Sequence, residues 1–117
     1  MRHRIKKSRL GRPSDHRNAM LRNLATSLVI EEHVETTISK AKTLQPIMER
    51  LMGYALKDTP REAIRKLDAY FFDQAASKKV LEVLKERYQD RKSGFTRIRA
   101  TGFRSGDGST TARIELI

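Results

Sequence analysis

The sequence lacks several features that would point to familiar classes of protein. It contains no cysteine, which excludes disulfide bonds and thiolate metal sites. No apolar run reaches the roughly eighteen residues of a membrane span, and no apolar segment follows the basic start, so we expect neither a membrane-spanning helix nor a secretory signal. Internal repeats and low-complexity tracts are also missing. The 117 residues, 38% of them hydrophobic, suffice for one modest core.

Acidic residues are scarce at the start of the chain, where most of the net charge gathers. Residues 1–22 carry eight Lys and Arg against Asp15 alone, a net +7, while the whole chain has +11. The first thirteen residues contain few apolar side chains and cannot bury enough surface to offset their conformational entropy. We therefore expect residues 1–13 to be a basic extended arm that needs a polyanionic partner. A pI near 10.4 suits nucleic acid, an anionic membrane or an acidic protein.

About four helices are predicted after the arm. Apolar residues recur at three- and four-residue steps in four segments: 15–31, from Ser39 onward, 60–72 and 74–90. Thr59 and Asp73 are the expected N-caps of the last two helices. Pro46 predicts either a kink in the second helix or a new helix start. Gly94 is the expected left-handed residue that ends the fourth helix.

Alternating patterns predict three strands. Residues 34–38, 95–103 and 111–117 alternate in polarity, and the Gly- and Asp-containing segment 104–109 predicts a hairpin turn between the last two. Ile98, Ala100, Ile114 and Leu116 would face the helices, and Arg97, Arg99 and Arg113 would face outward. The predicted fold class is α+β, with the helices packed on one face of a small sheet that ends in a C-terminal β-hairpin. It forms a single globular domain over residues 14–117, preceded by the arm.

The sequence contains no residue pattern typical of a catalytic or metal-binding site. His3, His16 and His33 do not lie three or four residues apart, so no metal site is expected. Asp15 and His16 are neighbours along a helix and point in different directions. Segment 104–108 lacks the Gly-Lys-Ser/Thr ending of a phosphate-binding loop, and no paired carboxylates suit acid–base work. We expect no enzyme activity, no cofactor and no small-molecule substrate.

What remains is a binding surface in three parts. The arm is the strongest, the exposed edge of the first helix is next, and the third is the outer sheet face with its hairpin, where no acid interrupts the basic residues between Arg91 and Arg104 along the chain. Arginine predominates, and its flat guanidinium binds phosphate in a two-pronged fork and stacks on bases. That favours structured RNA over a membrane surface, while composition leaves RNA and DNA both open.

Several blocks of the sequence resemble one family. They are Met1-Arg2-His3-Arg4, Leu10-x-Arg12, His16-Arg17-x-Ala19-Met20-x-Arg22-Asn23-x-Ala25-x-Ser27-Leu28, Thr36-Thr37-Ile38-x-Lys40-Ala41-Lys42-x-Leu44, Gly94-Phe95-Thr96-Arg97-Ile98, Gly102-Phe103-Arg104-x-Gly106-Asp107 and Ala112-x-Ile114-Glu115-Leu116. In this order, over nearly the whole chain, they resemble the ribosomal protein L seventeen family of the bacterial large subunit.

The resemblance implies a function. Members of the family are not enzymes but structural constituents of the large ribosomal subunit in the cytoplasm, bound to 23S rRNA near the outer end of the exit tunnel, beside other ribosomal proteins. A basic nucleic-acid-binding protein outside the ribosome, either an RNA regulator or a DNA-compacting protein, is the alternative, and a nuclease is a third. Charge and resemblance together give these candidate RNA-binding residues: Arg2, His3, Arg4, Lys6, Lys7, Arg9, Arg12, His16, Arg17, Arg22, Asn23, Lys40, Lys42, Arg91, Lys92, Arg97, Arg99 and Arg104.

Overall fold

A computed structural model describes residues 14–117, and the predicted arm, 1–13, lies outside the described residues. The described elements follow one another as α1 (Ser14–Glu31), β1 (His33–Thr37), α2 (Ile38–Lys57), α3 (Pro60–Tyr70), α4 (Gln74–Lys79), η1 (Val80–Leu84), α5 (Lys85–Arg87), β2 (Thr96–Phe103) and β3 (Thr110–Leu116). α4, η1 and α5 are consecutive and make up the predicted fourth helix.

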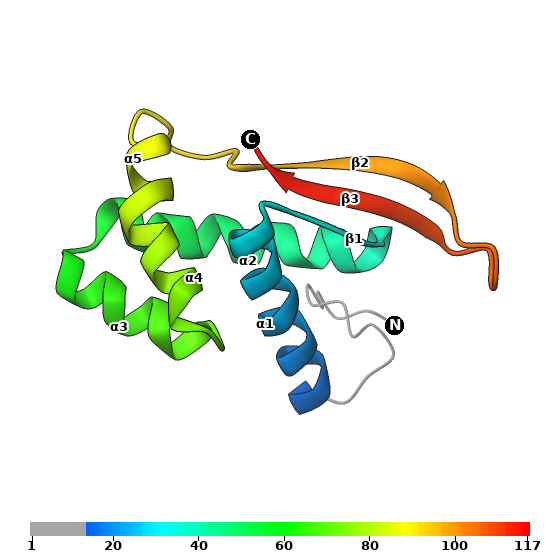
Figure 1. Ribbon diagram of the computed structural model, residues 1–117, viewed down its shortest axis with the longest axis horizontal. Helices are drawn as coiled ribbons and strands as arrows, with labels where there is room; N and C mark the ends of the chain where they lie inside the picture. Colours follow the sequence, from blue (N-terminus) through cyan, green and yellow to red (C-terminus); the bar gives the residue numbers. More distant parts are fainter. Residues whose placement is uncertain (1–13) are drawn as a thin grey trace, which may run out of the picture.

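The sheet is antiparallel, with the strand order β1-β3-β2. β3 lies in the centre, and Ile114 pairs with Val34 on one side and with Ile98 on the other. α1 and α2 contact the sheet, and α3 packs on α2 and α4. The hairpin tip extends past the helices at one end of the molecule (Figure 1). The predicted α+β fold with a C-terminal hairpin is confirmed.

α2 is a continuous helix of 20 residues with Pro46 inside it, so of the two predicted alternatives, a kink or a new helix start, the new start is wrong. The helix persists because its core-facing stripe, which includes Leu44, Met48 and Leu51, is buried on both sides of the proline. Tertiary packing of an amphipathic face contributes more to helix stability than local propensity. Pro46 itself is exposed to solvent.

The last helical segment contains a π turn. Its N-cap prediction is confirmed, because the Asp73 side chain accepts a hydrogen bond from the Ala75 amide. At Val80–Leu84 the pattern widens, and the Lys85 amide bonds to the Val80 carbonyl. The α-helix then ends at Arg87, before the predicted end. Gly94 does have a positive φ of 73°, but it leads into β2 rather than ending the helix.

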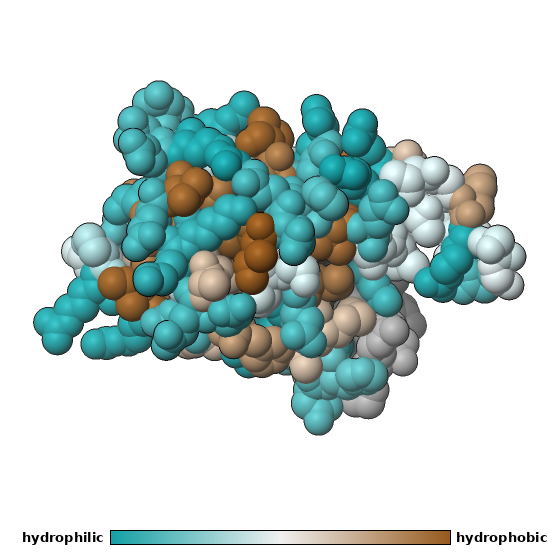
Figure 2. Space-filling view, viewed as in Figure 1, coloured by the Kyte–Doolittle hydropathy of each residue, from teal (hydrophilic) through white to brown (hydrophobic). Residues whose placement is uncertain are grey.

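The core lies between the helices and the inner face of the sheet. Its largest fully buried side chain is Phe95, whose ring centroid lies 5.4 Å from that of Tyr88. Ala100 on β2, which was expected to face the helices, is exposed, and so is Ile64 on the apolar stripe of α3. Hydrophilic residues cover most of the face seen in Figure 2, and hydrophobic ones form separate patches.

Candidate nucleic-acid interface

The predicted RNA-binding residues divide into two groups. Seven of them lie outside the described residues: Arg2, His3, Arg4, Lys6, Lys7, Arg9 and Arg12. Eleven are described: His16, Arg17, Arg22, Asn23, Lys40, Lys42, Arg91, Lys92, Arg97, Arg99 and Arg104. Six of the eleven lie on α1 and α2, where three of them line a hollow, and the other five lie on β2 or in the segments next to it.

An open hollow of about 810 Å³ lies between α1, α2 and the end of α3. It brings together three predicted residues, Arg17, Arg22 and Lys42, and adds Arg50, which sequence reasoning missed. Arg50 follows Lys42 by two helical turns on the exposed stripe of α2, a signal that the helical pattern already contained. The described residues that line the hollow include no carboxylate; they are Arg17, Asn18, Leu21, Arg22, Ser39, Lys42, Thr43, Pro46, Ile47, Arg50, Ala69 and Tyr70. We call this surface the helical groove.

Arg22 has a structural task in the helical groove. Its Nε donates to the Tyr70 carbonyl at 2.6 Å and its Nη2 to the Ala69 carbonyl at 2.9 Å. Its guanidinium also lies 4.3 Å from the centroid of the Phe72 ring. α3 has no basic residue in its own last turn, so Arg22 supplies the positive charge that favours a helix C-terminus. This cation therefore ties α1 to α3.

Tyr70 forms the α3 side of the groove. Burial raises the pKa of its phenol, and the nearby Arg50 and Arg22 oppose that rise. The Tyr70 ring also packs edge-on against Phe71 at 6.0 Å between centroids. The ring is thus fixed by packing, with two guanidinium groups close enough to influence its titration.

Three predicted residues lie on the same helices but do not line the helical groove. His16 and Asn23 are exposed on α1, and Lys40 is half-buried in the first turn of α2. The His16 amide bonds to the Asp15 carboxylate at 2.9 Å. These residues flank the groove rather than build it.

The outer face of the sheet carries acids as well as arginines. Glu115 on β3 accepts hydrogen bonds from Arg97 on β2 at 2.8 and 3.0 Å, and it forms ion pairs with Arg99 and Arg113 at 3.3 Å. The Arg97 hydrogen bonds, with the fields of Arg99 and Arg97 itself, hold the pKa of the Glu115 carboxyl below its usual value. The register also places Glu35 opposite Arg113. The arginines are uninterrupted by acid along the chain but not across the strands.

The ends of β2 show two more local arrangements. In the hairpin turn, Arg104 forms hydrogen bonds with the Asp107 carboxylate, which keep the pKa of Asp107 low. At the other end, Arg91 donates to the Gly94 carbonyl at 3.0 Å, and Lys92 is exposed. Arg91 and Arg104 therefore both hydrogen-bond to groups of the chain itself.

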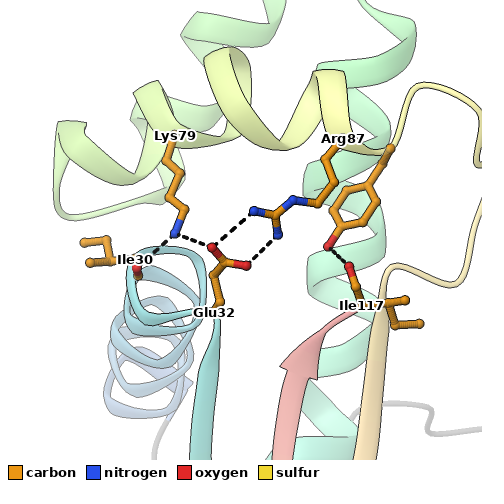
Figure 3. Close-up of polar contacts among 6 residues, drawn as sticks. Ile30, Glu32, Lys79, Arg87 and Ile117 are labelled. Carbon is orange, nitrogen blue, oxygen red and sulfur yellow. Dashed lines mark hydrogen bonds and ion pairs between the residues drawn. The ribbon is translucent and has the colours of Figure 1, made fainter.

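Sequence reasoning gave no role to the corner between α1 and β1, which Figure 3 shows. Glu32 adopts a positive φ of 68° there, and its carboxylate binds both nitrogens of the Arg87 fork and the Lys79 ammonium. Lys79 also donates to the Ile30 carbonyl at 3.0 Å. The two cations lower the pKa of Glu32 to about 2, chiefly through the Arg87 hydrogen bonds. This corner locks α1 to the last helical segment.

The described residues form neither a metal site nor a membrane span. Within residues 14–117 no group of three or more His, Cys, Asp or Glu is placed to hold a metal ion. In the same range, no helix has the length and apolar character to cross a membrane.

Comparison with known proteins gives a consistent result. The family model described as Ribosomal protein L17 matches residues 20–117. The chain is 45% identical to the large ribosomal subunit protein bL17 of Rickettsia bellii, over all of this chain and 82% of that one. It is 44% identical to the protein of the same name from Desulforudis audaxviator, over 93% of this chain and 96% of that one. For the Thermomicrobium roseum protein, also named bL17, the identity is 42% over 100% and 99% of the two chains. Because the family model and full-length relatives agree, the chain belongs to the ribosomal protein L17 family.

Proposed function

We propose that this chain is a structural constituent of the bacterial large ribosomal subunit that binds 23S rRNA through the arm and the helical groove. It lies beside other ribosomal proteins, on the exit-tunnel side of the subunit, and works in the cytoplasm as part of that particle. The proposal divides the chain into an RNA-binding arm, 1–13, and a globular domain, 14–117. Relatives that are named large ribosomal subunit proteins over the full length of the chain support it.

The observation that carries the proposal is one of position. Residues 1–22, which hold the net +7, include the first half of α1, and α1 contributes Arg17 and Arg22 to a groove whose described lining has no carboxylate. The cations of the arm and those that α1 contributes to the groove thus follow one another along the chain. Phosphates that bind there release counterions. The logarithm of the binding constant therefore falls by about 0.9 per tenfold rise in salt concentration for each duplex phosphate contact. The shape of the RNA, more than its base sequence, supplies specificity.

Sedimentation tests the assignment to the ribosome. The tagged full chain should travel with large-subunit particles in gradients of low magnesium concentration. A chain that stays at the top of the gradient, or that follows DNA, would indicate a free RNA regulator or a DNA-compacting protein. Turnover of RNA by the purified chain would indicate a nuclease. Either result would overturn the proposal.

A second experiment tests the arm. A variant that lacks residues 1–12 should enter large-subunit particles poorly, and its RNA affinity should depend less steeply on salt. A length-matched variant whose arm carries Gln at each Lys and Arg should behave in the same way. It keeps the length of the arm but removes the positive charge to which we attribute RNA binding. Wild-type incorporation with an unchanged salt slope would show that the arm is not the main anchor.

A further inference from the structure

Pro46 occupies a costly position. It lies in the interior of α2, where proline removes the hydrogen bond to the carbonyl four residues earlier and crowds that carbonyl, at a cost of about 3 kcal/mol. The side chain is exposed, so the core does not require it. The carbonyl that loses its intrahelical donor belongs to Lys42. Packing of the buried stripe keeps α2 continuous despite this loss.

The Pro46 side chain forms part of the helical groove. Pro46 lines the helical groove between Lys42 and Arg50, which precede and follow it by four residues on the same stripe of α2. These two cations are about 12 Å apart along the helix axis, given a rise of about 1.5 Å per residue. Leu21, Ile47 and Tyr70 give the groove apolar surface beside them. The proline thus adds a rigid apolar ring between two positive charges.

The size and chemistry of the groove suit a nucleotide better than a duplex. Its volume of about 810 Å³ falls within the range of about 300–1,000 Å³ that is typical of ligand pockets. A duplex presents phosphates on a convex surface and keeps its bases stacked, so it would leave apolar surface in a hollow uncovered. An unpaired nucleotide offers both an anionic phosphate and a flat base. Proteins bind single strands with positively charged grooves and aromatic side chains on which bases stack, and Tyr70 is the aromatic side chain in the described lining of this groove.

We propose that the helical groove receives an unpaired nucleotide of the rRNA, with its base against Pro46 and the adjoining apolar surface and its flanking phosphates on Lys42 and Arg50. This inference rests on the proposed function and names the form of RNA that the groove takes. The Lys42 carbonyl, freed by the proline, accepts a hydrogen bond from a base amino group or a 2′-hydroxyl. Arg22 does not bind the nucleotide directly but positions Tyr70 through the Tyr70 carbonyl.

The proposal predicts opposite effects of one substitution on stability and on binding. Pro46→Ala restores the helical hydrogen bond and should raise the urea midpoint of the free protein, so a loss of binding cannot be a folding defect. In competition with the wild type for large-subunit particles that lack this protein, it should be under-represented about three-fold or more, as expected when one packed base contact is lost. Pro60→Ala is the matched control, because Pro60 is also exposed but lies in the first turn of α3, away from the groove. It should compete equally.

The phosphate contacts have their own test. Lys42→Gln with Arg50→Gln, in the full chain, should reduce the salt slope for a single-stranded RNA oligonucleotide of mixed sequence by about 1.4, since each contact on a single strand contributes about 0.7. Equal competition by Pro46→Ala, or an unchanged slope in the double variant, would overturn the groove as a nucleotide site. Failure of the wild type itself to enter the particles would instead overturn the proposed function.

Discussion

The helical groove and the outer face of the sheet both contain several cations but differ in where the opposite charges lie. In the groove, Arg17, Arg22, Lys42 and Arg50 come from two helices, and the described lining has no carboxylate. On the sheet, Arg97 and Arg99 on β2 and Arg113 on β3 share a face with Glu115 and Glu35. The groove offers a concentrated positive charge, whereas the sheet face offers three arginines beside two acids.

The difference follows from the periods of the two elements. Along a strand, every second residue shares a face, so the positions of acids on neighbouring strands decide the charge that the face presents. Arg97 and Arg99 lie on the outer face, as predicted. Glu115 on β3 lies opposite Arg97 and therefore shares that face. On α2 the stripe of Lys42, Pro46 and Arg50 meets a cationic edge of α1 instead. A run of arginines in the sequence therefore predicts exposure better than it predicts available charge.

The largest expected effect concerns Arg22, a groove cation that hydrogen-bonds to the end of α3. Arg22→Met removes hydrogen bonds to two carbonyls at the end of α3 and should lower the free energy of unfolding by about 2 kcal/mol, a typical loss for charged hydrogen bonds. Arg22→Lys should recover only part of this, since an ammonium lacks the fork geometry. Urea unfolding measures both variants.

Arg50→Met is the control for this effect. Arg50 is exposed in the same groove, and its loss should change stability by no more than about 0.5 kcal/mol. If the two variants instead lost equal RNA affinity with no loss of stability in Arg22→Met, Arg22 would be an RNA contact rather than a structural tie.

The second prediction concerns the corner at Glu32, where the charges form ion pairs within the fold. The folded pKa of Glu32 is about 2 against an ordinary value of 4.5, so its ion pairs stabilise the protein fully above pH 4.5 and are lost as the pH falls through about 2. Because the carboxylate is 37% exposed, we expect only about 1 kcal/mol from it. Glu32→Gln should lose this amount at neutral pH and flatten the acid limb of stability between pH 4.5 and 2.

RNA binding provides the check on this assignment. The corner lies outside the proposed RNA-binding surface, so Glu32→Gln should leave the salt slope of RNA binding unchanged even though it releases Lys79 and Arg87. A steeper slope in this variant would mean that the two released cations reach the RNA. The corner would then belong to the interface rather than to the fold.

Most of the fold could be predicted because its signals are local. Thr59 and Asp73 were expected to cap helices, and both side chains accept the hydrogen bonds of that role. The strand patterns predicted the hairpin for the same reason. The π turn at Val80–Leu84 and the continuity of α2 through Pro46 could not be predicted, because they depend on how the buried stripes pack against other elements.

The site was predicted less completely, because its geometry joins distant parts of the chain. The arm is outside the described residues, so its predicted contacts stay predictions. Arg22 was expected at an exposed helix edge, and nothing in the local sequence indicates that it reaches the end of α3, 47 and 48 residues away. The pairing of Arg97 with Glu115 likewise needed the strand register. Arg50, in contrast, could have been predicted from its helical spacing to Lys42.

A smaller change on the sheet tests whether its arginines are held back by their acid. Glu115→Gln leaves the side-chain shape intact but removes the charge shared by Arg97, Arg99 and Arg113. We expect the affinity for duplex RNA to rise and the salt slope to steepen by about 0.9, the value for one further phosphate contact. Glu86→Gln on α5, an exposed site with the same change of charge, is the control for net charge alone. Equal effects in the two variants would remove any specific role of the sheet face.

The smallest effect is expected at the hairpin tip, where the resemblance suggested an RNA contact at Arg104. Arg104 and Asp107 pair within one exposed turn, and the backbone bonds between Arg104 and Ser109 and between Gly108 and Arg104 hold the turn without them. An exposed pair gains little from attraction because solvent screens it and two side chains lose freedom. Arg104→Gln should therefore change neither the urea midpoint nor the salt slope measurably. A slope reduced by about 0.9 would show that a phosphate displaces Asp107 from Arg104 on binding, and the tip would then join the helical groove as a second anchor.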